Sequence, residues 1–172
     1  MDKHLVRRIT PPLLVSLRLF RPEDDEVARA EAALGFELKS AADAWSLGDV
    51  STLRIRPDEW LVRGIEAAMV NRRLRGLFHH VTDLGGGSAV WNVMGQNAAD
   101  LIAMGGTLDF GAWRPGRAAR TLVAKVPMIV SRLEDGFELL ADSSHVAYLD
   151  AWLRAATAGE VGTGRAAHAA TA

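Results

Sequence analysis

The chain has 172 residues, 49% of them hydrophobic, so it is long enough to bury a core as one domain or as two small halves. Its 20 lysines and arginines against 21 aspartates and glutamates give a formal net charge of -1, which argues against a nucleic acid partner. Because cysteine is absent, disulfides, a thiolate nucleophile, iron–sulfur ligation and a cysteine-based zinc site are excluded.

The N-terminal segment is basic, and its short apolar run is broken by Pro11 and Pro12. No cleavage motif of small residues follows it, so we expect an unprocessed, cytoplasmic protein. No stretch reaches the roughly 18 uninterrupted apolar residues that span a bilayer. We therefore expect a soluble chain with no membrane partner.

The first half predicts a strand, a helix, a hairpin and a second helix. Residues 13–20 mix Leu and Val with Ser and Arg, which is typical of a strand with one buried face. Pro22, four acidic residues and then Gly35 indicate a helix between the proline and the glycine. Residues 51–56 and 60–64 predict a hairpin around the turn RPDEW. Residues 65–78 predict an amphipathic helix with Phe78 on its apolar face.

The second half predicts a similar order of elements. Residues 81–94 predict two strands joined by a turn at the three glycines 85–87, and residues 96–104 predict a short helix. The run ARTLVAKVPMIVSRL predicts one long strand with Pro127 at an edge or a bulge, which turns at EDG into the next strand. Ser143 or Ser144 is a candidate cap for a last helix. The Ala- and Gly-rich tail from about residue 157 is expected to be poorly ordered.

The two halves therefore repeat one pattern, although their sequences differ. Strands and helices in this order favour a split βαβ unit that buries helices on one face of an antiparallel sheet. We predict the α+β class with a duplicated split βαβ. The predicted parts are a first half at 1–84, a second half at 85–156 and a flexible tail at 157–172.

The chemically suggestive residues favour structural interpretations. Asp58 and Glu59 are adjacent in an extended segment and point to opposite faces, so they cannot easily share a proton. His79 and His80 are adjacent too, which does not suit metal chelation. The set Asp142, Ser144 and His145 is more typical of a helix cap than of a catalytic triad. We expect no catalytic, cofactor-binding or metal-ligating residue on this chain.

Two further groups raise the question of an anionic ligand. A dinucleotide fingerprint needs spaced glycines between a strand and a helix, whereas the glycines 85–87 join two predicted strands, so a hairpin turn is favoured. Arg72, Arg73 and Arg75 are compatible with an anionic ligand, with an acidic patch of another subunit, or with a solvated helix face.

Three segments in this order resemble the sarcosine oxidase gamma subunit family: RPDEWLV at 56–62, VTDL followed by a strand at 81–94, and GRAARTLVAKVPMIVSRLEDGFELLADSSHVAYLDAWL at 116–153. The resemblance covers about residues 10–155. The triple glycine and the appended tail depart from the family pattern. The resemblance implies a fold similar to the folate-binding domain of aminomethyltransferases. It also implies a heterotetramer in which alpha, beta and delta subunits are the partners of this chain.

The function that this resemblance implies is that of a structural, non-catalytic subunit. The whole enzyme would remove the N-methyl group of sarcosine or a related N-methyl amino acid and pass the one-carbon unit to tetrahydrofolate. FAD, FMN, NAD, tetrahydrofolate and zinc are expected in other subunits, and no cofactor is expected on this chain. As a hypothesis, Trp113, Arg114 and Arg117 help to dock the large subunit, because Trp113 lies in a turn-rich segment.

Three alternatives remain open. The chain could be a subunit of a related N-methylglutamate or dimethylglycine dehydrogenase. It could instead be a stand-alone folate-binding domain protein, which would need an acidic residue for the pterin ring and basic residues for the glutamate tail. An iron–sulfur maintenance protein with the same fold is disfavoured, since its signature segment needs a cysteine.

Overall fold

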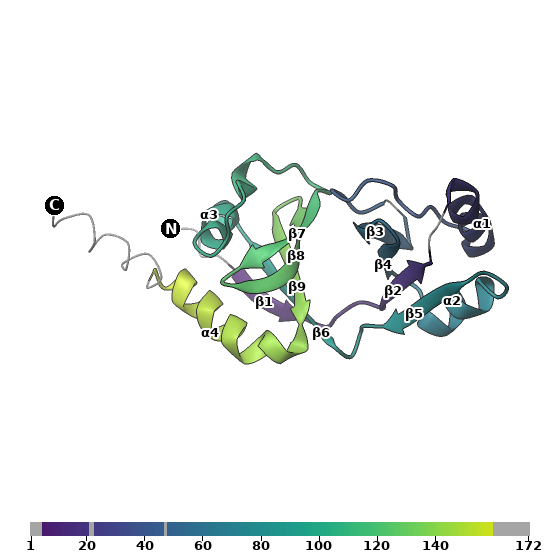
Figure 1. Cartoon of the computed structure of the whole chain (residues 1–172). Coiled ribbons are helices and arrows are strands. Elements are labelled where there is room, and N and C mark those ends of the chain that lie inside the picture. Colours follow the sequence, from purple (N-terminus) through teal and green to yellow (C-terminus); the bar gives the residue numbers. More distant parts are fainter. Residues whose placement is uncertain (1–4, 21–22, 47, 160–172) are drawn as a thin grey trace. The chain divides into compact units, whose positions relative to one another are not determined.

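The computed structural model describes residues 5–20, 23–46 and 48–159. The chain divides into two compact units, each built on an antiparallel sheet (Figure 1). The first unit contains Thr10–Ser88 and Gly116–Ala119. The second unit contains Ala89–Pro115, the chain from Arg120 onward and the N-terminal strand. The predicted division into halves at residue 84 therefore differs in two respects: the N-terminal strand belongs with the later residues, and Gly116–Ala119 belong with the earlier ones.

The first unit is a split βαβ fold. Its elements are, in chain order, β2 (Leu14–Leu19), α1 (Asp24–Leu34), β3 (Ser51–Arg56), β4 (Glu59–Arg63), α2 (Ala67–Arg73) and β5 (His79–Asp83). The strands lie in the order β3-β4-β2-β5, and each neighbouring pair is antiparallel. The crossover through α1 therefore spans β4, which is inserted between β2 and β3.

Alternation along the strands assigns one face of this sheet to the core. Val15, Leu17 and Leu19 are buried and belong to one cluster with Trp60 and Val62 of the neighbouring strand. The same cluster contains Ala30 and Leu34 of α1, Val70 of α2 and Leu74, which directly follows α2. The opposite face of the sheet carries Ser16, Arg18 and Glu59, which leaves polar side chains there for the network described below.

The second unit has a similar order of strands and helices, but one of its edge strands is the N-terminal strand. Its elements are β1 (Leu5–Ile9), β6 (Ser88–Met94), α3 (Ala98–Ala103), the short 3-10 turn η1 (Phe110–Ala112), β7 (Ala118–Val123), β8 (Val126–Leu133), β9 (Gly136–Asp142), the 3-10 turn η2 (Ser143–His145) and α4 (Val146–Thr157). The strand order is β1-β6-β9-β8-β7. β1 thus takes beside β6 the place that β5 takes beside β2, although β1 comes from the N-terminus.

The α+β prediction is confirmed: both sheets are antiparallel, and helices alternate with strands in both units. The helix that ends at Gly35 is confirmed too, since Gly35 adopts a left-handed φ of 77° and its N–H bonds to the Glu31 carbonyl. Pro22, which was expected to begin this helix, lies outside the described residues. So does most of the expected flexible tail.

The long strand predicted for ARTLVAKVPMIVSRL is wrong. It is a hairpin of β7 and β8, and its turn residues Ala124 and Lys125 have φ values of 51° and 65°. Two consecutive left-handed residues are the geometry of a tight two-residue hairpin turn. The sequence hides this turn because neither residue is the Gly or Asn that usually adopts such a conformation.

The hairpin predicted around Gly85, Gly86 and Gly87 is also wrong. The strands on either side, β5 and β6, belong to different sheets: β5 pairs with β2, and β6 pairs with β1. The glycine segment is a turn that carries the chain from one sheet to the other, with the Gly87 N–H bonded to the Leu84 carbonyl at 3.1 Å.

Two helix predictions need correction. α2 ends at Arg73, so Phe78 is not on its apolar face and is instead 72% exposed just before β5. Neither Ser143 nor Ser144 acts as the cap before the last helix. Asp142 instead caps the 3-10 turn η2 that leads into the last helix, since its carboxylate accepts a bond from the Ser144 N–H at 2.8 Å, and the N-cap position of α4 itself is His145, which makes no side-chain capping bond.

Candidate functional site

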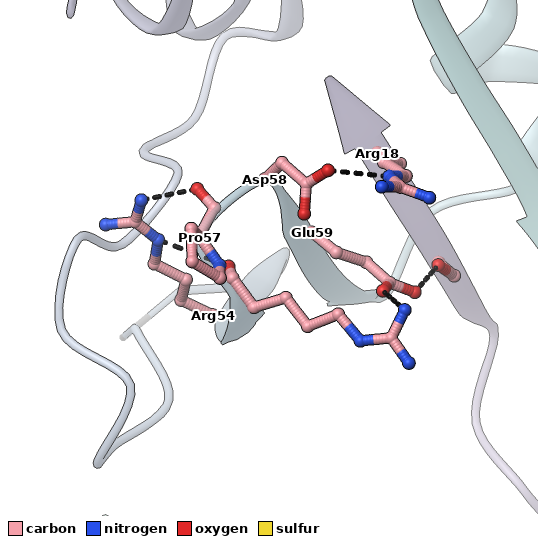
Figure 2. A network of polar contacts seen from close by, with 7 residues as sticks. Arg18, Arg54, Pro57, Asp58 and Glu59 are labelled. Carbon is pink, nitrogen blue, oxygen red and sulfur yellow. Dashed lines mark hydrogen bonds and ion pairs between the residues drawn. The ribbon is translucent and has the colours of Figure 1, made fainter. Parts of the chain in front are cut away.

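The turn RPDEW in the first unit holds a network of polar contacts (Figure 2). Asp58 Oδ2 accepts a bond from Arg18 Nε at 2.7 Å. The Glu59 carboxylate, whose side chain is 15% exposed, accepts from Ser16 Oγ at 2.7 Å and from Arg56 Nη1 at 3.2 Å. The two carboxylates have separate partners, which supports the structural interpretation of Asp58 and Glu59.

Arginine and tryptophan side chains fix the same turn from its other side. The Arg54 guanidinium donates to the carbonyls of Arg56 and Pro57 (Figure 2). It also donates to the Ser40 carbonyl at 3.1 Å. It also lies 5.4 Å from the ring centre of Trp60. The buried Trp60 indole donates to the Lys39 carbonyl at 2.9 Å. The segment therefore anchors the β3–β4 hairpin.

A second candidate is a cavity of about 460 Å³ in the second unit. Two strands and a helix form it, with α4 running beside the sheet that holds β1 (Figure 1). Its walls combine apolar side chains with two guanidinium groups and one carboxylate: Val6, Arg8, Trp91, Asp150, Leu153, Arg154 and Thr157.

Simple spacing rules bring these side chains together. Val6 and Arg8 are two residues apart on β1 and therefore share a face, and Arg8 lies opposite Trp91 in the β1–β6 register. Asp150, Arg154 and Thr157 follow one another at helical spacing on α4, next to the buried Leu153. The cavity is the junction of these two faces.

Asp150 organises the charges of the cavity. Its Oδ1 accepts a bond from the buried Trp91 indole at 2.7 Å, and its Oδ2 accepts from Arg8 Nη1 at 3.1 Å. Its main-chain carbonyl accepts from Arg154 Nε at 3.1 Å. One aspartate therefore positions both guanidinium groups and the indole.

The histidines have local partners. His79 lies 2.8 Å from the Leu77 carbonyl and 3.1 Å from Asn71 Oδ1, and the His80 ring lies 3.1 Å from Thr82 Oγ1. No cluster of three or more potential metal ligands occurs within the described ranges. The two rings of the pair thus have different neighbours.

The set Asp142, Ser144 and His145 forms a cap. Hydrogen bonds from Ser144, first of its side chain and then of its main-chain N–H, hold the pKa of Asp142 below its ordinary value of 3.8, with a smaller contribution from the charge of His145. The Asp142 carboxylate is exposed and bonds to the start of η2. This geometry fits the cap interpretation.

The three arginines near α2 do not act as one cluster. Arg73 donates to the Leu34 carbonyl and so links α2 to the end of α1. Arg72 and Arg75 are exposed. For these two residues an anionic ligand, an acidic patch of another subunit and a solvated surface all stay predictions.

The reason for choosing Trp113 as a docking residue is wrong. Trp113 is 6% exposed and packs with Phe110 and Phe137 at ring-centre distances of 5.2 Å and 6.3 Å. It belongs to the core of the second unit despite its turn-rich segment. Arg114 and Arg117 are exposed, but they belong to different units. A docking role for this set stays a prediction.

The cavity residues were not found from the sequence. Arg8, Trp91 and Asp150 lie on three elements that are far apart along the chain, and β1 itself was not predicted. The one local signal is the spacing of Asp150 and Arg154, which places opposite charges on one helix face.

The geometry first defines a class: a two-unit α+β protein in which the acidic residues most suggestive of chemistry are bonded to side chains or main chain of their own unit. The comparison with family models then gives the particular family. The model described as "Sarcosine oxidase, gamma subunit family" matches residues 23–159, so the chain belongs to this family.

One solved structure agrees with this assignment at the level of the fold. A chain of the heterotetrameric sarcosine oxidase from Corynebacterium sp. U-96, in complex with pyrrole 2-carboxylate, aligns with a TM-score of 0.80 and 22% identity over 92% of this chain and 85% of that chain. The regulatory subunit of aspartate kinase from Thermus thermophilus aligns over 90% of this chain and 97% of that chain with 12% identity, but its TM-score of 0.42 is too low to support an inference.

Two further results are negative. No curated protein matches the sequence. Over the part of the chain with described structure, no helix has both the length and the apolar character that crossing a membrane requires.

Proposed function

We propose that this chain is the structural, non-catalytic gamma subunit of a cytoplasmic, heterotetrameric oxidase of the sarcosine oxidase type. The observation that carries the proposal is the family match over residues 23–159. The fold likeness to a chain of a heterotetrameric sarcosine oxidase supports it. The partners are the alpha, beta and delta subunits of the same enzyme.

The use of the carboxylates supports a non-catalytic role. Asp58, Glu59 and Asp150 each accept hydrogen bonds from side chains of their own unit, and Asp142 accepts from the main chain of η2. These contacts account for the position of each carboxylate without a catalytic role. These four residues therefore stabilise the two units.

An exposed aromatic pair supports assembly with another chain. Phe20 and Phe78 pack against each other at a ring-centre distance of 4.6 Å with their planes tilted by 31°, and they remain 36% and 72% exposed. Arg18 lies 5.5 Å from the Phe20 ring centre. Exposed aromatic rings next to a cation are typical of the surfaces that bury Phe, Tyr and Arg in complexes. We infer that a neighbouring subunit of the oxidase covers this aromatic pair.

The assembled enzyme, in this proposal, oxidises the N-methyl group of sarcosine or a related N-methyl amino acid and passes the one-carbon unit to tetrahydrofolate. FAD, FMN, NAD, tetrahydrofolate and zinc belong to other subunits. The alternative is that the chain is a subunit of a related N-methylglutamate or dimethylglycine dehydrogenase. Oxygen consumption with each amino acid, compared with reduction of an artificial acceptor, distinguishes an oxidase from a dehydrogenase.

The stand-alone folate-binding alternative has less support. The cavity of the second unit contains an acidic residue and two arginines, as folate recognition would need. However, both carboxylate oxygens of Asp150 already accept bonds, from Trp91 and Arg8. These bonds give Asp150 a structural role that does not require a pterin ring.

Affinity purification from the source organism, followed by native mass spectrometry, tests the proposal. We expect a four-chain complex that contains flavin and oxidises an N-methyl amino acid. A chain that purifies alone as a monomer and binds a reduced folate would support the folate alternative and refute the subunit role.

The aromatic pair has its own test. Phe78→Ser should weaken capture of the other subunits while leaving the isolated chain folded, because Phe78 is mostly exposed. Leu13→Ser is a matched control, since Leu13 is an exposed apolar residue at 53% in the same unit. Equal capture by both variants and the unmodified chain would show that the aromatic pair is not a subunit contact.

A further inference from the structure

The cavity of the second unit has donor groups that its own residues do not use. Arg8 engages only its Nη1 and Arg154 only its Nε in the bonds to Asp150. For the remaining N–H groups of these two guanidinium groups, no acceptor occurs among the described residues. A guanidinium has five N–H donors in a planar fork, so each arginine retains most of its hydrogen-bonding capacity.

The electrostatics of the cavity favour an anion. Two guanidinium groups and one carboxylate line it, which leaves a net charge of about +1 if all three are ionised. Both oxygens of the Asp150 carboxylate point at donors that they already serve, Trp91 and Arg8. An incoming carboxylate would therefore meet unused N–H groups rather than the negative oxygens.

The apolar part of the wall favours a ligand with a hydrocarbon portion. Val6, Leu153 and the Trp91 ring lie beside the two arginines. The volume of about 460 Å³ falls within the roughly 300–1,000 Å³ of small-molecule sites. Such sites combine an apolar lining with a few polar groups that fix orientation, and paired N–H groups of arginine bind carboxylates in a bidentate manner.

We propose that the cavity formed by β1, β6 and α4 binds a small monocarboxylate that carries an aromatic or aliphatic group. Arg8 and Arg154 contact the carboxylate, and the hydrocarbon portion packs against Val6, next to the buried Leu153 and Trp91. The Asp150 carboxylate positions Arg8 and the indole, and the Asp150 main-chain carbonyl accepts the bond from Arg154. This inference does not depend on the proposed subunit role.

The alternative is a solvated surface ion pair with no ligand. The Arg8–Asp150 pair is partly exposed, with side-chain exposures of 52% and 35%, and pairs of this kind often contribute little on their own. The test must therefore detect a bound carboxylate directly and must show that the arginines recognise it.

Benzoate is a suitable probe, and the Trp91 indole is a built-in reporter. Its N–H bonds to Asp150 at the cavity wall and gives a resonance in the ¹H–¹⁵N spectrum of the full-length chain, which Trp91→Phe assigns. We expect benzoate to shift this resonance in a saturable manner. Benzyl alcohol, which keeps the ring but lacks the charge, should cause no saturable shift.

Substitution of the arginines completes the test. Arg154→Gln should weaken benzoate binding about tenfold, which corresponds to about 1.4 kcal/mol for a lost charge-assisted contact. Arg29→Gln, an exposed arginine of α1 in the first unit, should leave the affinity unchanged. The indole resonances of the other tryptophans report whether each variant is folded, and Arg8→Lys gives a second variant that keeps the charge.

Three results would overturn the proposal. The first is the absence of a saturable benzoate shift in the unmodified chain. The second is an equal response to benzyl alcohol, which would show an apolar pocket with no anion recognition. The third is unchanged benzoate affinity in both folded arginine variants, Arg154→Gln and Arg8→Lys.

Discussion

Replacing Trp113 with alanine separates a core role from a docking role for this residue. Trp113 follows η1 and is 6% exposed, and its ring packs between Phe110 and Phe137. The Phe110 and Phe137 rings also contact each other, at a centre distance of 5.9 Å and nearly edge to face. Removing the indole therefore removes one of three mutually packed rings from the core of the second unit.

The expected loss of stability is large. Truncation of a buried Trp or Phe to Ala typically costs about 3–5 kcal/mol, from lost transfer free energy and the cavity that remains. Each aromatic pair contributes about 0.5–1.5 kcal/mol beyond its buried area, and two such pairs are lost. The low end applies if Phe110 and Phe137 collapse into the space, and the high end if they stay in place. Either value is a large share of the roughly 5–15 kcal/mol that stabilises a typical domain.

Urea unfolding of the isolated chain, followed by circular dichroism, measures this loss. Arg114→Ala is the matched control, because Arg114 is the exposed neighbour and should change the free energy of unfolding by no more than about 0.5 kcal/mol. If Trp113→Ala unfolds at the same urea concentration as the unmodified chain while the oxidase complex fails to assemble, the core interpretation is refuted and the docking prediction is supported.

Two further predictions concern the second unit. Gly136→Ala should destabilise the chain by at least about 1–3 kcal/mol, because the new Cβ would lie 2.2 Å from the Val93 carbonyl oxygen, whereas Gly86→Ala, which meets nothing within 4 Å, should be nearly neutral in the same melting experiment. Asp142→Asn should lower the melting temperature at neutral pH. The folded-state pKa of Asp142 is depressed, so its contribution is present above the ordinary value of 3.8 and is lost as the pH falls through the folded-state value. The two melting curves should therefore converge in strong acid, and a difference that persists there would contradict the cap interpretation.

Most of the first unit could be predicted from the sequence because its signals are local. The acidic first turn and Gly35 delimit α1, and the alternation of Leu53 and Ile55 with arginines marks the hairpin. The sequence rule for Asp58 and Glu59 assumed that both residues are extended, whereas Asp58 lies in the turn and only Glu59 lies in β4. The structure gives them separate partners, Arg18 for Asp58 and Ser16 for Glu59.

Predictions failed where tertiary structure overrides local preference. Ala124 and Lys125 both adopt left-handed conformations, which residues other than glycine rarely do, so nothing local marked the β7–β8 turn. Trp113 is buried inside a Gly- and Pro-rich segment because Phe110 and Phe137 surround it. The glycines 85–87 were predicted to form a hairpin because the flanking segments both have strand character. The sheet that each strand joins depends on the whole topology, and here β5 pairs with β2 and β6 pairs with β1.

The missed strand and the missed cavity have one cause. β1 is short and basic, and its residues give no clear alternation, so only its pairing with β6 identifies it as a strand. That pairing places Arg8 opposite Trp91, and the position of α4 then brings Asp150 within reach of both. In the first unit the equivalent edge strand, β5, follows the second helix, α2. A repeated pattern therefore predicts that the edge strand of the second unit follows α4, whereas it is the N-terminal strand β1. The N-terminal origin of β1 thus supplies one of the two arginines that distinguish this cavity.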